Sequence, residues 1–160
     1  MTRHARGLKA IVIGGLLMAL AACSSSSSSL DGRTAATPGS EQDFIVNVGD
    51  RVFFPTDQTN MTDAGMDTLR RQAAWLKLYP QVKILVEGHA DERGTREYNL
   101  APSARRSANS KTFLISQGVD PSRIRTISYG KERPVALCDA ESCWSQNRRA
   151  VTVVTEGAAS

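Results

Sequence analysis

The sequence predicts an α/β fold: a two-layer sandwich with the element order β-α-β-α-β-β, in which a four-stranded mixed sheet has its helices on one face. Three observations support this prediction. Short stretches rich in valine, isoleucine and phenylalanine alternate with two segments of helical periodicity. Glycines and prolines separate these stretches. The predicted domain spans residues 43–156, and a chain of roughly 115 residues can bury a sufficient core without a metal.

Three apolar stretches in the first half of the domain favour β-structure. Residues 44–48 and 51–54 flank Gly49-Asp50, and the second of them is the better candidate for a strand of the sheet. Residues 82–87 are mostly apolar on both faces, which is typical of a central strand.

A helix is expected from about residue 63 to residue 79. Thr62 can cap its N-terminus, and Pro80 ends it because the residue before a proline disfavours helical backbone. An apolar stripe recurs at intervals of three and four residues: Met66, Leu69, Ala73 and Leu76. Trp75 belongs to the flank of this buried face.

The second half of the domain contains a further helix and two strands. The helix is expected at residues 95–117 and the strands at 124–129 and 149–155. Between the strands lies a long irregular segment, residues 130–147, and residues 157–160 form a frayed tail.

Pro102 interrupts the second helical segment. A proline in a helix interior removes a hydrogen bond and costs around 3 kcal/mol. We therefore expect residues 96–101 to form an initial turn and Pro102 to open the main helix. If a single kinked helix forms instead, Arg106 is displaced.

The N-terminus has the features of an export signal, residues 1–22. Arg3, Arg6 and Lys9 precede an apolar run, residues 10–22, that is too short for a bilayer span of ~20 residues. Removing these three cations from 20 basic residues leaves 17 against 16 acidic ones, a net charge near +1. Nucleic-acid binding therefore loses its support from composition.

The signal ends in Leu20-Ala21-Ala22-Cys23, which resembles the lipobox of bacterial lipoproteins. The resemblance implies cleavage before Cys23 and acylation of that cysteine; an ordinary signal peptide is the alternative. Ser24, rather than an aspartate, follows the cysteine, and in this the chain resembles lipoproteins that are transported to the outer membrane. Residues 23–42 are rich in serine and other small polar residues, which predicts a flexible tether.

A cluster of charged residues follows the predicted central strand. Asp91, Glu92 and Arg93 precede Gly94, and Arg106 comes fifteen residues after Asp91, about four turns along a straight helix. Opposite charges around one opening suit a small zwitterion, since a carboxylate binds an ammonium and a guanidinium binds a carboxylate.

This stretch resembles the OmpA-like peptidoglycan-binding domain. The matching residues are Gly88-His89-Ala90-Asp91-Glu92-Arg93-Gly94-Thr95, then Glu97-Tyr98-Asn99, then Arg105-Arg106. The likeness continues through residues 128–132 and 147–151 and covers roughly residues 43–155.

The resemblance implies that the chain recognises diaminopimelate in the peptidoglycan stem peptide. Asp91 would bind its ammonium and Arg106 its carboxylate. Four more residues would line the same site: Phe54, Gly94, Thr95 and Asn99. The alternative for Asp91 and Arg106 is a structural salt bridge between a turn and a helix, which contributes about 0–1 kcal/mol when exposed.

Residues near these positions are expected to have supporting roles. Arg105 lies some 100° around the helix from Arg106 and is expected to be solvated or bonded to the domain. Tyr98 and Leu100 are expected in the core, and His89 is expected to be structural. Residues 147–149 are expected to support the site or bind nearby carbonyls. Pro55 and Thr56 stand where the family often has an acidic residue, so one polar ligand contact is expected to be missing.

Cys138 and Cys143 would lie in an oxidising periplasm, where a disulfide is expected. Half of a zinc site is the alternative, but His89 is the only histidine after the signal, and a four-ligand site needs more donors. We expect no metal and no cofactor.

Three classes of function fit these features unequally. The first is a lipid-anchored binding module of the outer membrane facing the periplasm, which by resemblance belongs to the Tol-Pal system of cell division and envelope integrity, with TolB as a partner. The second is a wall enzyme that uses Asp91 and Glu92 as acid and base, although adjacent residues point apart. The third is a domain borrowed from a porin or a flagellar motor stator. We expect a binding module and no enzyme.

Overall fold

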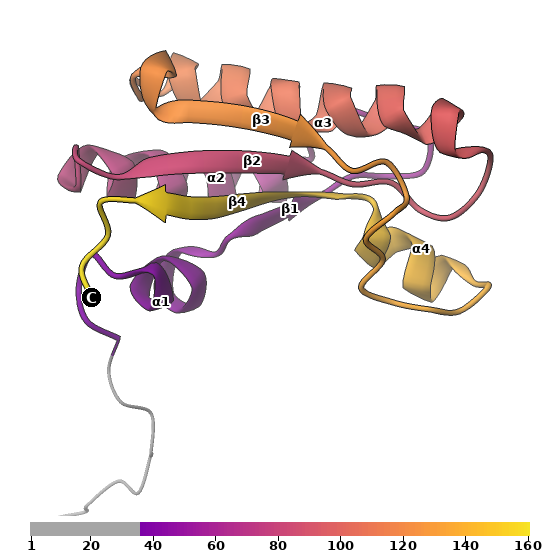
Figure 1. Ribbon diagram of the computed structural model, residues 1–160, viewed down its shortest axis with the longest axis horizontal. Coiled ribbons are helices and arrows are strands. Elements are labelled where there is room, and N and C mark those ends of the chain that lie inside the picture. Colours follow the sequence, from indigo (N-terminus) through magenta and orange to yellow (C-terminus); the bar gives the residue numbers. More distant parts are fainter. Residues whose placement is uncertain (1–35) are drawn as a thin grey trace, which may run out of the picture. The chain divides into compact units, whose positions relative to one another are not determined.

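The computed structural model describes residues 36–160 and contains one four-stranded sheet (Figure 1). The strands β1 (Arg51–Phe53), β2 (Lys83–Gly88), β3 (Ile124–Ser128) and β4 (Arg149–Glu156) lie in the order β1-β4-β2-β3. β4 is antiparallel to β1 and β2, whereas β2 and β3 are parallel. The sheet is therefore mixed, with β2 between two other strands, as the sequence predicts.

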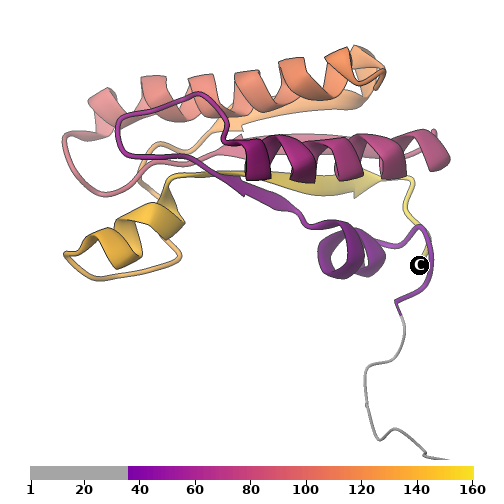
Figure 2. The same cartoon turned by 180° about the vertical axis from the view of Figure 1, so that it is seen from behind.

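Two long helices cover one face of this sheet, which confirms the predicted two-layer sandwich (Figure 2). α2 (Asp63–Leu78) begins at Thr62, whose side chain accepts a hydrogen bond from Gly65 N, and ends before Pro80. α3 (Arg96–Ser116) packs beside it. The core between helices and sheet is formed mainly by Leu69, Ala73, Leu76, Val82, Ile84, Val86, Leu114 and Ile124.

The strand directions bring several chain segments to one end of the sheet. In the parallel and antiparallel registers of β2, Gly88 lies opposite Ser128 and Ala150. β2 and β3 therefore end where β4 begins, and α3 starts at the same end, close to the short helix α4 (Glu141–Asn147) (Figure 1). Side chains from distant parts of the sequence meet there.

The start of the domain differs from the expectation. Residues 44–48, expected to favour β-structure, form the wide helical turn η1 (Phe44–Val48) after α1 (Glu41–Asp43). The Phe44 ring packs on Trp75 with centroids 4.9 Å apart, and Trp75 Nε1 donates to Asp43 Oδ2 over 2.8 Å. Tertiary packing therefore overrides the β-propensity of this stretch.

The folded unit also includes residues assigned to the tether and the tail. Ser40 caps α1, and Ala159 N donates to Gly39 O over 3.0 Å, so residues 39–42 and 159 belong to the domain. The expected signal peptide, Cys23 and most of the tether lie outside the described residues.

The expectation that Pro102 opens a separate helix is wrong, because α3 runs without interruption through Pro102. Thr95 caps the whole helix by accepting a hydrogen bond from Tyr98 N over 3.1 Å. The carbonyl that loses its partner to proline belongs to Tyr98, a residue 68% exposed, so water can bond it.

The prediction that Tyr98 and Leu100 are core residues is also wrong, because the Tyr98 side chain is mostly exposed and that of Leu100 is half exposed. α3 turns an unusually polar face to the sheet: Asn99, Ser103, Arg106, Ser107, Ser110 and Leu114. Small serines let the helix approach the strands closely, and their hydroxyls bond backbone carbonyls, as Ser110 does with Arg106 O over 2.9 Å. The exposed apolar residues of this helix thus misled the prediction.

The segment between β3 and β4 is not wholly irregular, because it ends in α4. The turn η2 (Pro121–Arg123) precedes β3. Cys138, which precedes α4, forms a disulfide with Cys143, which lies within α4. Asn147 is fully buried and accepts hydrogen bonds from Val135 N and Ala136 N, which fastens the loop to the end of α4.

Candidate functional site

A cleft of about 220 Å³ opens at the end of the sheet where these segments meet. Its walls come from the loop after β1, the loop after β2, the first turns of α3 and the start of β4. The lining residues are Asp57, Thr59, Ala90, Asp91, Arg93, Gly94, Tyr98, Asn99, Pro102, Arg105, Arg106 and Arg148. Four of the six predicted binding residues are among them: Asp91, Gly94, Asn99 and Arg106.

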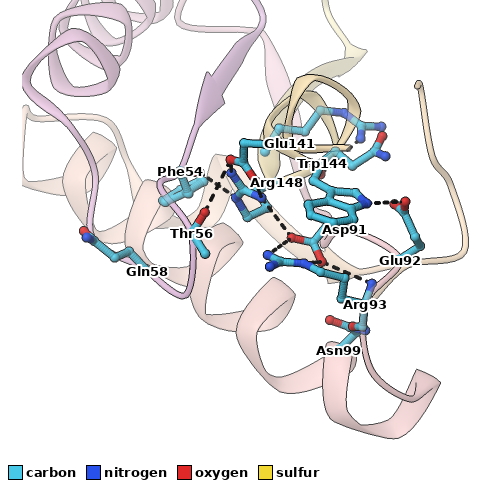
Figure 3. Close-up of polar contacts among 12 residues, drawn as sticks. Phe54, Thr56, Gln58, Asp91, Glu92, Arg93, Asn99, Glu141, Trp144 and Arg148 are labelled. Carbon is cyan, nitrogen blue, oxygen red and sulfur yellow. Dashed lines mark hydrogen bonds and ion pairs between the residues drawn. The ribbon is translucent and has the colours of Figure 1, made fainter. Parts of the chain in front are cut away.

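Asp91 is almost buried in the wall of this cleft and is held by two arginines (Figure 3). Arg93 donates through Nε over 3.2 Å and through Nη2 over 2.8 Å, and Arg148 Nη1 donates over 3.0 Å. Burial alone would raise the pKa of Asp91, but these hydrogen bonds lower it below its ordinary value. The carboxylate is therefore ionised at neutral pH.

Arg148 is the buried partner of Asp91. Its side chain is 3% exposed, and it also bonds Glu141 on α4 and, through Nε over 3.2 Å, Phe54 O. Burial opposes the charge of Arg148, but the bonds to Glu141 and Asp91 raise its pKa overall. Arg148 thus joins the starts of β4 and α4 to the loop that contains Asp91.

Arg106 is buried, and no carboxylate of residues 36–160 forms an ion pair with it. Its Nε and Nη2 donate to Gln58 O over 3.2 and 3.0 Å, and its Nη1 donates to His89 O over 2.9 Å. Burial, together with the nearby charge of Arg148, lowers the pKa of Arg106 to about 10, so the group stays cationic at neutral pH. Arginine has five N–H donors, and the carbonyls of residues 36–160 use three of them. One N–H on each terminal nitrogen is therefore left for an acceptor from outside these residues.

The structure therefore does not contain the salt bridge that was the alternative for Asp91 and Arg106. Within residues 36–160, the ion pairs of Asp91 go to Arg93 and Arg148. Asp91 and Arg106 instead line the same cleft from two sides, and α3 does not displace Arg106 from it despite Pro102.

The other predicted binding residues shape the cleft in different ways. Asn99 Nδ2 donates to Arg93 O over 2.7 Å and to Thr95 O over 3.1 Å, which fixes the loop before α3. Gly94 adopts a φ of 82°, a backbone conformation that favours glycine. Thr95 serves as the helix cap rather than as a wall of the cleft. Phe54 is buried, and its ring lies beneath the Arg106 guanidinium at 5.4 Å.

Several residues of the site were missed or placed differently by the sequence. Arg105 is exposed, as expected, and it also lines the cleft. Asp57 lines the cleft too, at a positive φ of 55°, and supplies an acidic group two residues after Pro55, where the sequence analysis expected an acidic contact to be missing. No spacing rule points to Asp57, since only the turn after Pro55 brings it round.

α4 supports the charged cluster from outside the cleft (Figure 3). The Trp144 ring lies 4.6 Å from Arg93 Cζ, and its Nε1 donates to Glu92. Glu92 therefore has a different partner from Asp91, and it does not line the cleft. This arrangement does not favour the alternative in which Asp91 and Glu92 act as a catalytic acid and base. No spacing along the chain indicates that this loop folds back onto the site.

Residues 147–149 support the site as expected. Besides the contacts of Arg148 and Asn147, Arg149 donates to Asn147 O over 3.3 Å and to Arg133 O over 3.1 Å.

His89 is buried beside Tyr129, with ring centroids 5.6 Å apart. Neither ring nitrogen has a hydrogen-bond partner among the described residues, although Nε2 lies 3.4 Å from Glu87 Oε2. Burial, with the charges of Arg149 and Arg133, lowers the pKa of His89 to about 4. The ring is therefore neutral at pH 7 and contributes its backbone carbonyl to Arg106.

The described part of the chain contains no group of three or more His, Cys, Asp or Glu side chains that could hold a metal ion. No helix within residues 36–160 is both long and apolar enough to cross a membrane.

Comparison with known proteins agrees with this architecture. The family model described as the OmpA family matches residues 53–149, more than half of the chain. A peptidoglycan-associated lipoprotein of Agrobacterium fabrum is 58% identical over 153 residues, which cover 91% of this chain and 86% of that protein. The chain belongs to the peptidoglycan-associated lipoproteins of the OmpA family. A peptidoglycan-associated lipoprotein of Brucella melitensis is 63% identical over 123 residues, which cover 77% of this chain and 73% of the relative.

Solved structures share the fold. The crystal structure of the peptidoglycan-associated lipoprotein from Burkholderia pseudomallei aligns with a TM-score of 0.64 and 40% identity, covering 66% of this chain and 90% of that one. The C-terminal domain of Helicobacter pylori MotB aligns with a TM-score of 0.62 over 67% of this chain and 84% of its own, but at 24% identity it shows the fold alone.

Proposed function

We propose that this chain is an outer-membrane lipoprotein that binds peptidoglycan without covalent chemistry. The ligand group is the diaminopimelate side chain of the stem peptide, which carries an ammonium and a carboxylate on one carbon. Family membership supports the general function, and the charges of the cleft support the ligand.

One observation carries the ligand assignment: Asp91 and Arg106 present opposite charges to the same cleft, and neither is bonded to the other. Burying a cation without a carboxylate partner is costly, and Arg106 is bonded only to neutral carbonyls. A ligand carboxylate would supply the missing partner.

The geometry of Arg106 suits a carboxylate better than a single acceptor atom. With one N–H left on each terminal nitrogen, the guanidinium fork can donate to a ligand carboxylate through charge-assisted hydrogen bonds, which are stronger and more directional than neutral ones. The carbonyls of Gln58 and His89 hold this fork in place before the ligand arrives. Asp91 provides the opposite charge for the ammonium.

The N-terminal segment supports an anchored arrangement of the domain. We propose that residues 1–22 are removed, that Cys23 is acylated, and that the serine-rich residues after it tether the domain to the outer membrane on its periplasmic side. Two acyl chains give stable anchoring. By its family the protein would act in the Tol-Pal system during cell division, with TolB as a partner that competes for an overlapping surface.

The binding proposal is tested by calorimetric titration of residues 36–160 with a stem tripeptide that ends in meso-diaminopimelate. Asp91→Asn and Arg106→Gln each remove one ligand charge, and loss of a charge-assisted hydrogen bond of about 1.5–3 kcal/mol predicts about 10- to 150-fold weaker binding. Arg125→Gln, at an exposed position on β3, serves as the matched control and should bind like wild type.

Thermal unfolding of each variant separates loss of binding from loss of the fold. Wild-type protein that does not bind the tripeptide, or folded Asp91 and Arg106 variants that bind it normally, would refute the ligand assignment. Release of soluble fragments from purified sacculi would instead favour an enzyme.

The anchor is tested separately in cells by incorporation of a labelled fatty acid. Wild-type protein should be labelled and should fractionate with the outer membrane, whereas Cys23→Ser should be unlabelled and soluble. Equal labelling of both would rule out Cys23 as the acylated residue.

A further inference from the structure

Both oxygens of the Asp91 carboxylate already accept two hydrogen bonds each from arginine donors. Its Oδ1 accepts from Arg93 N and Arg93 Nε, both over 3.2 Å, and its Oδ2 accepts from Arg93 Nη2 over 2.8 Å and Arg148 Nη1 over 3.0 Å. An ionised carboxylate offers about four lone-pair sites. An incoming ammonium therefore finds no free acceptor, and one donor must leave.

The two guanidinium groups differ in how easily they can leave. The Arg148 side chain is 3% exposed and is fixed by Glu141 and by Phe54 O as well as by Asp91. Without Asp91 it would remain buried with only part of its bonds, which is costly. The Arg93 side chain is 39% exposed and borders the cleft, so water can solvate it at once. Arg93 is the group that can move.

We propose that Arg93 occupies the ammonium position on Asp91 in the empty cleft and is displaced from it when the ligand binds. This inference rests on the proposed function, because it concerns the same ligand. Arg93 is thereby an internal competitor that lowers the affinity of every ammonium ligand for Asp91.

The Trp144 ring gives the displaced side chain a contact that Arg93 already makes. The Trp144 ring already lies 4.6 Å from Arg93 Cζ, and its bond to Glu92 fixes the ring. A guanidinium can keep this cation–π contact while its N–H groups turn from Asp91 to water. The carboxylates of Asp57 and Glu141 also attract Arg93, so its charge remains compensated after the exchange.

The exchange lowers the net gain of any ammonium that binds Asp91, so a ligand needs a second contact to bind tightly. An amine alone replaces one cation on Asp91 with another and gains little. A zwitterion makes the same replacement and in addition bonds the free fork of Arg106. The expected preference is therefore for diaminopimelate over lysine, which has the ammonium but lacks the side-chain carboxylate.

The test compares two stem tripeptides, one ending in meso-diaminopimelate and one ending in lysine, by calorimetric titration. Wild-type protein should bind the first much more tightly. Arg93→Gln removes the competitor and should bind the lysine peptide about two- to fivefold more tightly than wild type, the range expected for an exposed ion pair. The diaminopimelate peptide should gain the same factor, because both ammonium groups displace the same guanidinium from Asp91.

Arg96→Gln is the matched control, since Arg96 is three residues away, pairs with Glu132 over 3.0 Å and is 73% exposed. It should leave both affinities unchanged. Arg93→Lys keeps the charge but not the fork and should give an intermediate affinity for the lysine peptide. In wild-type protein, the NMR signal of Arg93 Nε–H should shift when the diaminopimelate peptide saturates the cleft.

The outcomes separate this inference from the proposed function. Wild-type protein that binds neither peptide would overturn both. Wild-type protein that binds diaminopimelate while Arg93→Gln gains no affinity for lysine, or an Arg93 Nε–H signal that does not move on binding, would overturn the role of Arg93 and leave the proposed function intact.

Discussion

Replacing Gly88 with alanine should separate the helix that bears Arg106 from the sheet that bears Asp91. A Cβ at position 88 would lie 1.9 Å from the Ser103 carbonyl oxygen and 2.7 Å from its carbonyl carbon. Both atoms belong to the backbone of α3, so no side-chain rotation can relieve the contact. Gly88 is thus the point at which β2 and α3 touch.

The size of the effect follows from these distances. Carbon and oxygen normally approach to about 3.3 Å, so the backbone must move by more than 1 Å. Overpacking of a core costs typically 1–3 kcal/mol, and here the movement also strains the bond from Gly130 N to Ser103 Oγ and that from Arg106 Nη1 to His89 O. We expect a loss near the top of that range, about 3 kcal/mol, and a fall in Tm of about 12 °C.

Urea denaturation of Gly88→Ala beside Gly65→Ala measures the effect. Gly65 lies inside α2, and an added Cβ would meet its nearest atom, Thr62 Oγ1, at an ordinary 3.4 Å. Alanine there should stabilise the protein by about 0.5–1 kcal/mol. A Gly88→Ala variant within 0.5 kcal/mol of wild type would refute the close approach of β2 and α3.

Two further predictions concern stability. Changing both Cys138 and Cys143 to serine removes a disulfide that closes a loop of about six residues, which should cost about 2 kcal/mol in urea denaturation; a variant as stable as oxidised wild type would contradict the chain-entropy account. The pKa of His89 is lowered to about 4 in the folded protein, against about 6.5 when unfolded. The contribution of the neutral ring to the free energy of unfolding is therefore complete above pH 6.5 and is lost as the pH falls through 4. His89→Phe keeps the contact with Tyr129 but not the titration, and its stability relative to wild type should therefore improve by about 2 kcal/mol between pH 7 and 4.5; parallel pH profiles would show that His89 does not titrate in this range.

The sequence predicts the order and type of the main elements because each has a local signal. Thr62 and Pro80 mark the ends of α2, and the apolar residues at both faces of β2 indicate its central position. The same local signals fail at residues 44–48, where packing on Trp75 decides the conformation. They also fail in α3, where the buried face is built from serines and an arginine rather than from apolar residues.

The sequence predicts the two charged residues that line the cleft from two sides, but not the contacts that hold them in place. The motif identifies Asp91 and Arg106, and both line the cleft. The ion pair between Asp91 and Arg148 spans 57 residues and depends on the register of β4 beside β2. Spacing along the chain cannot show such a contact, because it is set by how the strands pair.

Arg148 also determines which variants can test the site. Asp91 neutralises Arg148. Truncating Asp91 to alanine would leave Arg148 buried with a single carboxylate partner from residues 36–160, Glu141, which is more than half exposed. Loss of one member of a buried pair is strongly destabilising. Asp91→Asn keeps the shape and one acceptor, whereas alanine would mix a loss of binding with a loss of stability. The buried Arg148 also explains how Asp91 stays ionised although it is nearly buried, because a fixed arginine compensates its charge. On the proposed function, a cationic ligand would exchange with the exposed Arg93 and leave Arg148 in place.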